Sequence, residues 1–408
     1  MKKLRGFFQK RMKKAPIDSE TMRNEYYENI SVRFGIAQVV LFLLLFAFVI
    51  LSLVGNTELI TYRNFYYFFK DLNASAEAVD IFDNDSVSYP TDTDQSFALY
   101  RKGLAVAGNS SVTVFSATGR QILSVPINYR NPRAVGTGKY LLVYEAGGTQ
   151  YSLYNSDVQI HSAKTDYPIY GAEVSESGKY ALITASRDYA TVVSLYGSNF
   201  SKLTDYNFKN KYAMDVTINS QGTRIGILSS IPEQGAFSTT FLLAEIGAET
   251  AIAEPEVSGA LGMSCSFTSS GKIAILCTDS VVYLSEKGQK VKEKYSLGGL
   301  EVTHADVGIS GIALSAKVSA VSAKSTVLVF DKDGNAVYRA ETEEKIGQIL
   351  FFDRVVFWKN PNGVSRLRLS NGSVSSVDCM TDGRVLLAVS DNEVLCCSPQ
   401  KAVYVGFD

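Results

Sequence analysis

Short apolar runs alternate with polar turns along most of the chain beyond residue 78. Five stretches share one pattern, an apolar run, a polar turn with glycine and a second apolar run: AVGTGKYLLVYEA (134–146), VSESGKYALITAS (174–186), INSQGTRIGILSS (218–230), FTSSGKIAILCTD (267–279) and CMTDGRVLLAVSD (379–391). Two such runs joined by a short glycine-containing turn predict a β-hairpin. The repetition of this pattern predicts an all-β domain.

A second hairpin follows each of the first ones. Its turns lie at residues 116–120, 154–158, 196–200, 244–248, 285–289, 331–335, 369–373 and, in a weaker copy, 397–401. Successive turns are separated by 38, 42, 48, 41, 46, 38 and about 28 residues. Four short strands in a repeat of ~40–50 residues are typical of propeller blades. We expect a β-propeller of eight blades, with seven blades as the alternative count and an array of β-sandwiches as the alternative architecture.

Closure of such a ring needs a partner for the last blade. A four-stranded blade cannot bury its two apolar faces alone, and closing the ring limits the exposed sheet edges. The segment AVDIFD (78–83) precedes the first blade. We predict that it supplies the outer strand of the last blade, so that the propeller domain spans residues 78–408.

Residues 35–54 (GIAQVVLFLLLFAFVILSLV) carry no charge. A helix of this length, at ~1.5 Å per residue, spans the ~30 Å hydrocarbon core of a bilayer. We therefore expect a single transmembrane helix, with a buried core helix or a cleaved signal peptide as alternatives. The run is longer than the apolar part of a typical signal peptide, and no small-residue cleavage site follows it.

Basic residues are concentrated before this apolar run. Residues 1–34 carry nine Lys and Arg against four Asp and Glu, whereas residues 55–408 carry 31 against 37. The positive-inside rule predicts a cytoplasmic N-terminal tail and a C-terminal domain on the opposite side of the membrane. The acidic balance of the large domain argues against nucleic acid as its partner, because phosphate contacts need a basic surface.

An aromatic stretch, TYRNFYYFFKDL (61–72), follows the apolar run within the segment 55–77. Tyr62, Phe65, Tyr66 and Phe69 share one face of a helix, since they stand at positions i, i+3, i+4 and i+7. Two interpretations stay open. The aromatic face lies in the headgroup region of the membrane, or it packs under the propeller and fixes its orientation.

Two resemblances add to this picture. The S-x-S-G-K-Y-A-L hairpin at residues 175–182 is similar to the S-P-D-G-K-x-I-A hairpins of bacterial WD40-like and TolB-like propellers, although it lacks the proline. Through Y-x-N-x-Y-Y-F-x-K-D-L at residues 62–72, the whole chain resembles an uncharacterised family of single-pass membrane-anchored β-propeller proteins of Gram-positive bacteria. The resemblance implies this architecture and a location in the cell envelope, and it implies no activity.

Acidic residues recur before the first-hairpin glycines. Glu173, Asp306 and Asp378 each stand five residues before such a glycine, and Asp215 stands seven before its own, on the same strand face. If these strands are innermost, the carboxylates gather near one end of the central channel and bind a cation or a basic partner segment. The alternative, which we favour, is that each accepts hydrogen bonds from the backbone of a neighbouring blade's turn.

His304 completes this candidate ligand-binding site. It stands two residues before Asp306, so the two side chains share a strand face and can bind a cation together. Two ligands do not make a metal site, and a hydrogen-bonded structural pair is the favoured alternative. We therefore expect no metal and no cofactor.

Residues for catalysis are scarce. The chain has two histidines and no G-x-S-x-G motif, so no hydrolase triad is predicted. The segment DKDGN (331–335) lacks the further carboxylates of a calcium-binding loop, so we predict that it forms a hairpin turn. A quinone-dependent propeller oxidoreductase would have recurring tryptophans, and this chain has one.

Five cysteines lie in the last blades, and none forms a C-x-x-C motif. Their odd number excludes complete pairing within the chain, so we expect most of them to be buried thiols. Cys265 and Cys277 flank one hairpin and are candidate cross-strand neighbours.

The function expected from these features is that of a non-enzymatic, membrane-tethered module that binds a protein partner in the cell envelope. The long loops 230–240 and 248–262 of the fourth repeat are candidates for its binding face, because insertions in repeat arrays often mark that face. One alternative is an envelope sensor that binds a cation or a cell-wall fragment in the channel. A carboxylate-based envelope hydrolase or lyase is a further, weaker alternative.

Overall fold

The computed structural model describes residues 25–54, 86–233, 235–248, 250–291, 294–379 and 382–407, with side chains in the helix described for residues 32–47. The chain divides into two compact units, residues 1–66 and 67–408, which are described separately. The tail before residue 25, the predicted aromatic segment 55–77 and the predicted closing strand 78–83 lie outside the described residues.

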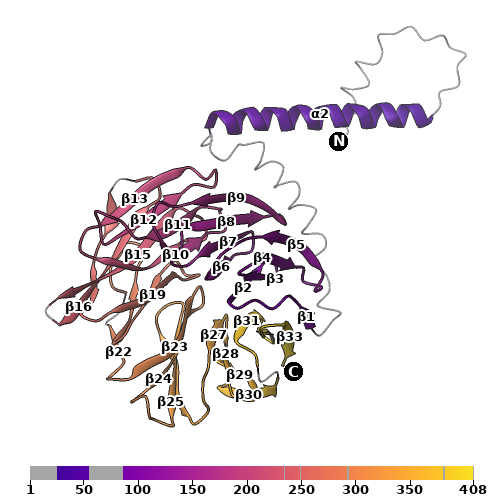
Figure 1. Cartoon of the computed structure of the whole chain (residues 1–408). Coiled ribbons are helices and arrows are strands. Elements are labelled where there is room, and N and C mark those ends of the chain that lie inside the picture. The colour runs from indigo at the N-terminus through magenta and orange to yellow at the C-terminus, as the bar shows by residue number, and fades with distance from the viewer. Residues whose placement is uncertain are drawn as a thin grey trace, which may run out of the picture. The chain divides into compact units, whose positions relative to one another are not determined.

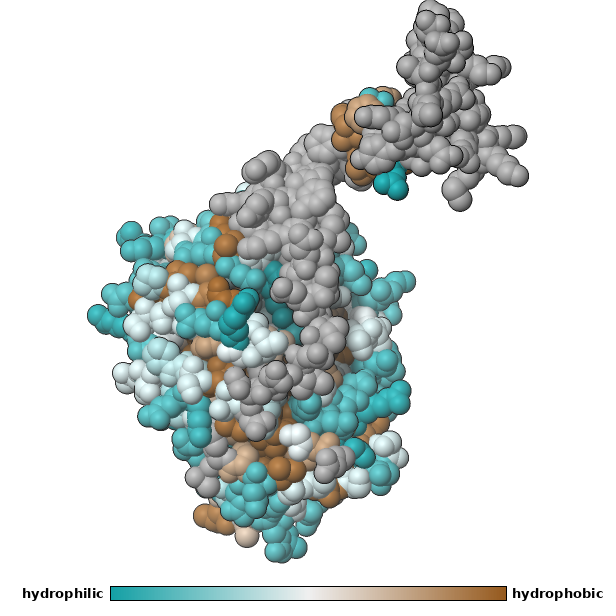
Figure 2. All heavy atoms as spheres, turned by 90° about the vertical axis from the view of Figure 1, so that its right-hand side faces the viewer, coloured by the Kyte–Doolittle hydropathy of each residue, from teal (hydrophilic) through white to brown (hydrophobic). Residues whose placement is uncertain are grey.

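The described part of the first unit is one helix, α2 (Glu25–Val54). It begins within the predicted tail and ends where the predicted transmembrane segment ends. Phe34, Leu41 and Phe42 are exposed, and the described side chains of α2 are mostly apolar (Figure 2). Within the described residues, no helix is both long enough and apolar enough to cross a membrane.

The second unit is a ring of eight antiparallel sheets, the blades of a propeller (Figure 1). Blades one to four contain, from the inside outward, β2 (Gln95–Tyr100), β3 (Gly103–Gly108), β4 (Ser111–Phe115) and β5 (Gln121–Pro126); β6 (Pro132–Gly136), β7 (Tyr140–Glu145), β8 (Gln150–Asn155) and β9 (Val158–Lys164); β10 (Ile169–Val174), β11 (Tyr180–Thr184), β12 (Thr191–Tyr196) and β13 (Lys202–Phe208); β14 (Tyr212–Ile218), β15 (Arg224–Glu233), β16 (Ala236–Glu245) and β17 (Ala251–Ala253), with β18 (Glu256–Ser258) also paired to β16.

Blades five to eight continue the ring. They contain β19 (Gly262–Phe267), β20 (Ile273–Cys277), β21 (Ser280–Leu284) and β22 (Tyr295–Ser296); β23 (Glu301–Gly308), β24 (Gly311–Lys317), β25 (Ser325–Asp331) and β26 (Ala336–Thr342); β27 (Ile349–Phe352), β28 (Val355–Lys359), β29 (Gly363–Arg368) and β30 (Ser373–Asp378); β31 (Val385–Ser390), β32 (Glu393–Cys397), β33 (Lys401–Gly406) and β1 (Ser86–Ser88). The expectation of an all-β, eight-bladed propeller is confirmed for the described residues.

The first strand of each blade lies at the centre of the ring. Each of these innermost strands contacts the innermost strand of the next blade, and β31 of the eighth blade contacts β2 of the first. Figure 1 shows the same arrangement, with β2, β6, β10 and β23 around the centre and β5, β13 and β30 at the rim. The innermost strands therefore surround the centre of the ring.

Strands from both ends of the domain close the ring. In the eighth blade, β1 pairs with β33, so that Ser86 lies opposite Val403 and Ser88 opposite Lys401. A strand from the N-terminal side thus completes the last blade, as we predicted. The strand that does so is 86–88, a few residues beyond the segment that we had assigned to this role.

This closure explains why the last repeat is short. In the first seven blades, the predicted second-hairpin turns join the third and fourth strands. The turn at residues 397–401 instead joins β32 and β33, the second and third strands, because β1 supplies the fourth. The prediction of a first hairpin over residues 379–391 was wrong, since this segment links the outer strand β30 of blade seven to the innermost strand β31 of blade eight.

Apolar side chains fill the interfaces between neighbouring blades. Between blades three and four, for example, Ile183 and Leu195 pack against Val216 and Ile227. Successive residues on a strand point to opposite faces of the sheet, so one blade contributes to two such cores. Burial of these two faces, at ~25 cal/mol per Å² of apolar area, is the main force that holds the ring together.

Candidate functional site

A β-bulge recurs in the innermost strands of four successive blades. The pairing register shifts between Ile169 and Gly171, between Ala213 and Asp215, between Gly262 and Ser264, and between Val302 and His304. One extra residue is inserted at each shift, namely Tyr170, Met214, Met263 and Thr303. A bulge redirects the side chain of the inserted residue and often occurs beside a functional site.

Three of the inserted residues are large apolar side chains that stay exposed. Tyr170 is 58% exposed, and Met214 and Met263 are each 39% exposed. They lie on adjacent blades, three to five, near the beginning of β10, β14 and β19. We call the end of the ring where the innermost strands begin the entry face, and these three side chains the bulge patch.

The long hairpin of the fourth blade projects from this same face. Tyr212, the first residue of β14, lies opposite Ser230, whereas β15 and β16 continue beyond it to the pair Glu233 and Ala236. Phe237, in this extension, and Tyr212 are also exposed. The predicted loop 230–240 therefore adds apolar surface on the entry face next to the bulge patch.

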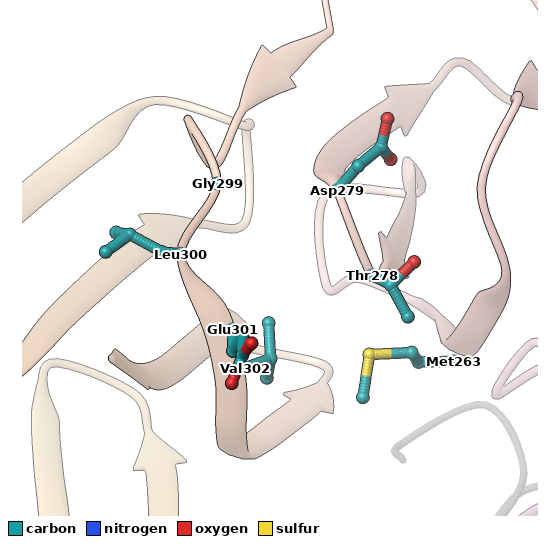
Figure 3. Close-up of a pocket in the computed structure, with 7 residues that line it drawn as sticks. All are labelled: Met263, Thr278, Asp279, Gly299, Leu300, Glu301 and Val302. Carbon is teal, nitrogen blue, oxygen red and sulfur yellow. The ribbon is translucent and has the colours of Figure 1, made fainter. Parts of the chain in front are cut away.

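A pocket of about 370 Å³ opens between blades five and six, beside Met263 of the bulge patch. Figure 3 shows Met263 and Thr278 facing Glu301 and Val302 across the pocket, whereas the side chain of Leu300 points away. The pocket has both apolar and carboxylate groups in its walls. It extends the bulge patch toward blade six.

Asp279 supplies a fixed negative charge at the edge of this pocket. Its carboxylate forms an ion pair with Lys294 at 2.7 Å and accepts hydrogen bonds from the hydroxyls of Ser258 and Ser280. Burial by itself would raise the pKa of Asp279, but the three hydrogen bonds and the lysine charge together lower it. The group is therefore ionised at neutral pH.

Asp215 connects two blades. Its Oδ2 accepts hydrogen bonds from the backbone N–H of Cys265 at 2.9 Å and from the hydroxyl of Ser264 at 2.7 Å, both on β19 of the next blade. Burial raises the pKa of this carboxyl, although these hydrogen bonds oppose the rise. The arrangement agrees with the alternative that we favoured, except that the donors lie on the neighbour's innermost strand and not in its turn.

Asp306 makes the same kind of contact two blades further on. Its Oδ2 accepts a 2.7 Å hydrogen bond from the backbone N–H of Phe351 in β27. The nearby His304 contributes a buried Nδ1 that has no hydrogen-bond partner among the described residues, and burial lowers the pKa of this histidine. No hydrogen bond joins His304 to Asp306 among the described residues, so the hydrogen-bonded pair that we favoured for them is not formed there.

The same role is filled by neutral side chains in other blades. The hydroxyl of Ser96 on β2 accepts a hydrogen bond from the backbone N–H of Ala134. The side chain of Gln348 accepts a hydrogen bond from the backbone N–H of Leu386 on β31 and donates one to the carbonyl of the same residue. An innermost strand has a paired neighbour on one side only, so some of its N–H groups need another acceptor. Hydrogen bonds from polar side chains therefore connect the innermost strands of adjacent blades, whether or not these side chains are acidic.

Glu173 differs from the other predicted residues, because no hydrogen bond or ion pair to it is present within the described residues. Burial, and secondly the charge of Asp215, raise its pKa to about 8. Burial is the main cause that raises the pKa of Tyr144 and of Cys265, and the charges of the same two carboxyls add to the rise, which places the four groups close together. Glu173 is thus a partly buried carboxyl on an innermost strand that retains some accessible surface.

Asp378 does not join this group. It ends β30, the outermost strand of blade seven, opposite Gly363, and it is exposed. Our placement of this residue on an innermost strand was wrong, because the turn that follows it connects two blades. The structure therefore brings Glu173 and Asp215 close together, whereas His304 and Asp306 lie on β23 of blade six and Asp378 on β30 of blade seven.

Metal-binding groups of three or more His, Cys, Asp or Glu side chains are absent from the described part of the chain. The bulge patch was not predicted from the sequence. Its only signal there is an apolar residue that interrupts the alternation at the start of an innermost strand, and a strand pattern alone does not distinguish this from an ordinary buried position.

Solved structures of propellers resemble this chain. The C-terminal WD40 domain of Sif2 matches with a TM-score of 0.56 and 12% identity, covering 81% of this chain and 99% of that one. Sqt1 of Chaetomium thermophilum, bound to the N-terminus of ribosomal protein L10, matches with a TM-score of 0.55 and 10% sequence identity. The match covers 79% of this chain and 100% of that one. BamB of Moraxella catarrhalis matches with a TM-score of 0.53 and 10% sequence identity, and the match covers 79% of this chain and 99% of that one. At these identities the likeness shows the fold alone, and it confirms the expected WD40-like propeller.

At the level of sequence, no curated protein matches the chain. A family model described as a family of unknown function, DUF5711, matches residues 80–401, which include nearly the whole propeller. Because this match covers most of the chain, the protein belongs to the DUF5711 family.

Proposed function

We propose that this protein is a membrane-tethered, extracytoplasmic module of the cell envelope that binds a protein partner through the entry face of its propeller and has no enzymatic activity. The observation that carries the proposal is the repeated bulge, which keeps Tyr170, Met214 and Met263 exposed on adjacent blades. Aromatic and methionine side chains are enriched in protein interfaces, and apolar patches of this kind mark interaction sites.

The surroundings of the bulge patch support a protein partner. Tyr212 and Phe237 extend its apolar surface, and the pocket beside Met263 can receive a partner side chain. The charged edge at Asp279 and Lys294 is suited to the polar rim of an interface. Sqt1, a propeller of similar fold, is bound to the N-terminus of a ribosomal protein.

Tethering to the membrane rests on the sequence. The uncharged run 35–54 is long enough to span a bilayer, and the basic residues precede it. The orientation that follows places the propeller outside the cytoplasm. Protease treatment of intact cells tests this part, because an extracytoplasmic propeller is digested while an epitope tag at the N-terminus survives. Survival of both in intact cells, with digestion of both after lysis, would contradict it.

Cross-linking in the native membrane tests the interaction surface. Partners captured by the full chain are compared with those of a variant in which the bulge patch carries Tyr170→Ser, Met214→Ser and Met263→Ser. The matched control is Val337→Ser with Val374→Ser, which removes exposed apolar side chains from the outer strands β26 and β30. We expect one partner that the control retains and the patch variant loses. Equal capture by both folded variants would reject the entry face as the binding surface.

A second candidate function is a sensor that binds a cationic ligand in the channel. It is favoured by Glu173, whose deep carboxyl has no hydrogen-bond or ion-pair partner among the described residues. Thermal unfolding with Ca²⁺, Mg²⁺ or soluble peptidoglycan fragments tests this candidate, because a ligand that binds the folded state raises the unfolding midpoint. The rise should vanish in Glu173→Gln. No rise with any of these probes counts against the sensor and leaves the interaction module as the proposal.

A further inference from the structure

Two cysteines face each other across the interface of blades seven and eight. The Sγ atoms of Cys379 and Cys396 are 3.6 Å apart. Cys379 follows the outer strand β30 of blade seven, and Cys396 lies on β32 of blade eight. The sulfur atoms need to approach by about 1.5 Å to reach the bond length of a disulfide.

The strand geometry selects Cys396 as the partner of Cys379. Cys396 and Cys397 are consecutive on β32 and point to opposite faces of the blade. Cys396 belongs to the apolar core between blades seven and eight, together with Cys379, whereas Cys397 belongs to the core between blades eight and one. Cys379 therefore meets only one of the two neighbouring thiols.

The two thiols differ in a way that suits disulfide exchange. Cys379 is partly exposed and Cys396 is fully buried, so a reagent reaches Cys379 first. The hydrogen bond with Cys396 lowers the pKa of the Cys379 thiol, with help from Lys359 and against the effects of burial, Asp378 and Asp382. The same contact raises the pKa of Cys396. The thiolate is the attacking species, so Cys379 is the first to react.

We infer that Cys379 and Cys396 are an oxidation site that forms a disulfide between blades seven and eight when the protein meets a low-molecular-weight disulfide. The Cys379 thiolate attacks one sulfur of that disulfide, which forms a mixed disulfide and releases one thiolate. Cys396 then attacks the Cys379 sulfur, releases the second thiolate and gives up its proton to it. Two protein thiols are oxidised, and one external disulfide is reduced to two thiols.

The position of this bond gives it a structural consequence. Blade eight is completed by β1 from the other end of the domain, so this blade depends on non-covalent pairing with Ser86–Ser88. A disulfide from Cys379 to Cys396 closes a loop around β31, the innermost strand of this blade. It therefore constrains the unfolded chain and stabilises the part of the ring where closure occurs.

Treatment of the full-length protein in detergent with oxidised glutathione, followed by alkylation in denaturant and peptide mass spectrometry, tests the inference. We expect a linked Cys379–Cys396 peptide and a fall in alkylated cysteines from five to three. The rate should rise with pH at values below the ordinary thiol pKa of about 8.5. The oxidised protein should unfold at a higher temperature than the reduced protein.

Three variants separate the possible outcomes. Cys379→Ser and Cys396→Ser should each abolish the linked peptide, and Cys379→Ser should unfold at the same temperature with and without oxidant. Cys397→Ala, the matched control, should still form the linked peptide. Three results with the wild-type chain would overturn the inference: a glutathione adduct that persists on Cys379, a disulfide that uses Cys397, or five alkylated cysteines after treatment. None of these results depends on the folding of a variant.

Discussion

Asp306 on β23 accepts a 2.7 Å hydrogen bond from the backbone N–H of Phe351 on β27 and thereby joins the innermost strands of blades six and seven. Both groups are largely shielded from water, and burial raises the pKa of the carboxyl. The contact satisfies an N–H group that lies on the unpaired side of an innermost strand. It shows why an acid that looked like a channel ligand in the sequence has a structural role.

Replacement of Asp306 should reveal this role. Asp306→Ala leaves the Phe351 N–H without an acceptor, and we expect it to lower the free energy of unfolding by about 1–3 kcal/mol. Asp306→Asn keeps an acceptor oxygen and should stay closer to the wild type. Asp378→Ala, at an exposed position, should change stability by less than about 0.5 kcal/mol. Urea denaturation of the three variants measures these differences, and equal effects of the two alanine substitutions would contradict the assignment.

Glu173 should make stability depend on pH. Burial and Asp215 raise its pKa from 4.5 to about 8, so the folded protein binds a proton there that the unfolded chain releases. Stability from this group is therefore fully present below pH 4.5, decreases as pH rises and is lost by about pH 8. In Glu173→Gln this decrease disappears, so the variant gains stability relative to the wild type between pH 6 and pH 9. Unfolding free energies at the two pH values test this, and a constant difference would show that the carboxyl is ionised throughout.

Closure of the ring by β1 should be weakened at Val87. This side chain is 3% exposed, packs in the core between blades eight and one, and lies opposite Ala402. Val87→Ala should lower the free energy of unfolding by about 1–3 kcal/mol. It should also speed amide hydrogen exchange in β33, while the amides of β28 stay protected. Ser88→Ala, at the exposed next position, serves as the control. Unchanged exchange in β33 would mean that β1 contributes little to closure.

Two glycines in equivalent turns should respond differently to alanine. Gly334 and Gly372 both have positive φ, +84° and +69°, in the third-to-fourth-strand turns of blades six and seven. A Cβ at Gly334 would come within 2.8 Å of the Tyr283 ring on blade five, whereas a Cβ at Gly372 meets no atom within 4 Å. Gly372→Ala should lower the free energy of unfolding by about 1–2 kcal/mol, because alanine is strained in the left-handed conformation. Gly334→Ala should lower it by more, because its Cβ also meets the Tyr283 ring. Thermal unfolding of both variants decides this, and equal midpoints would show that Tyr283 moves aside freely.

The candidate site was predictable only in part. The sequence placed Glu173, Asp215 and Asp306 on innermost strands, and the structure has them there. It did not reveal that Asp215 and Asp306 form hydrogen bonds with the next blade, while no hydrogen bond to Glu173 is present among the described residues. These differences arise from residues about one repeat away along the chain, such as Cys265 and Phe351, and strand alternation carries no information about them.

The sequence by itself determined the repeated hairpins and hence the propeller, because strand alternation and turn glycines are local requirements of the backbone. Tertiary structure alone decided which strand closes the ring, where bulges expose Tyr170, Met214 and Met263, and which thiol meets Cys379. The physical reason is that these features depend on how one blade packs on the next. A single inserted residue reverses the direction of a side chain, and a neighbour's position is fixed only when the ring is closed.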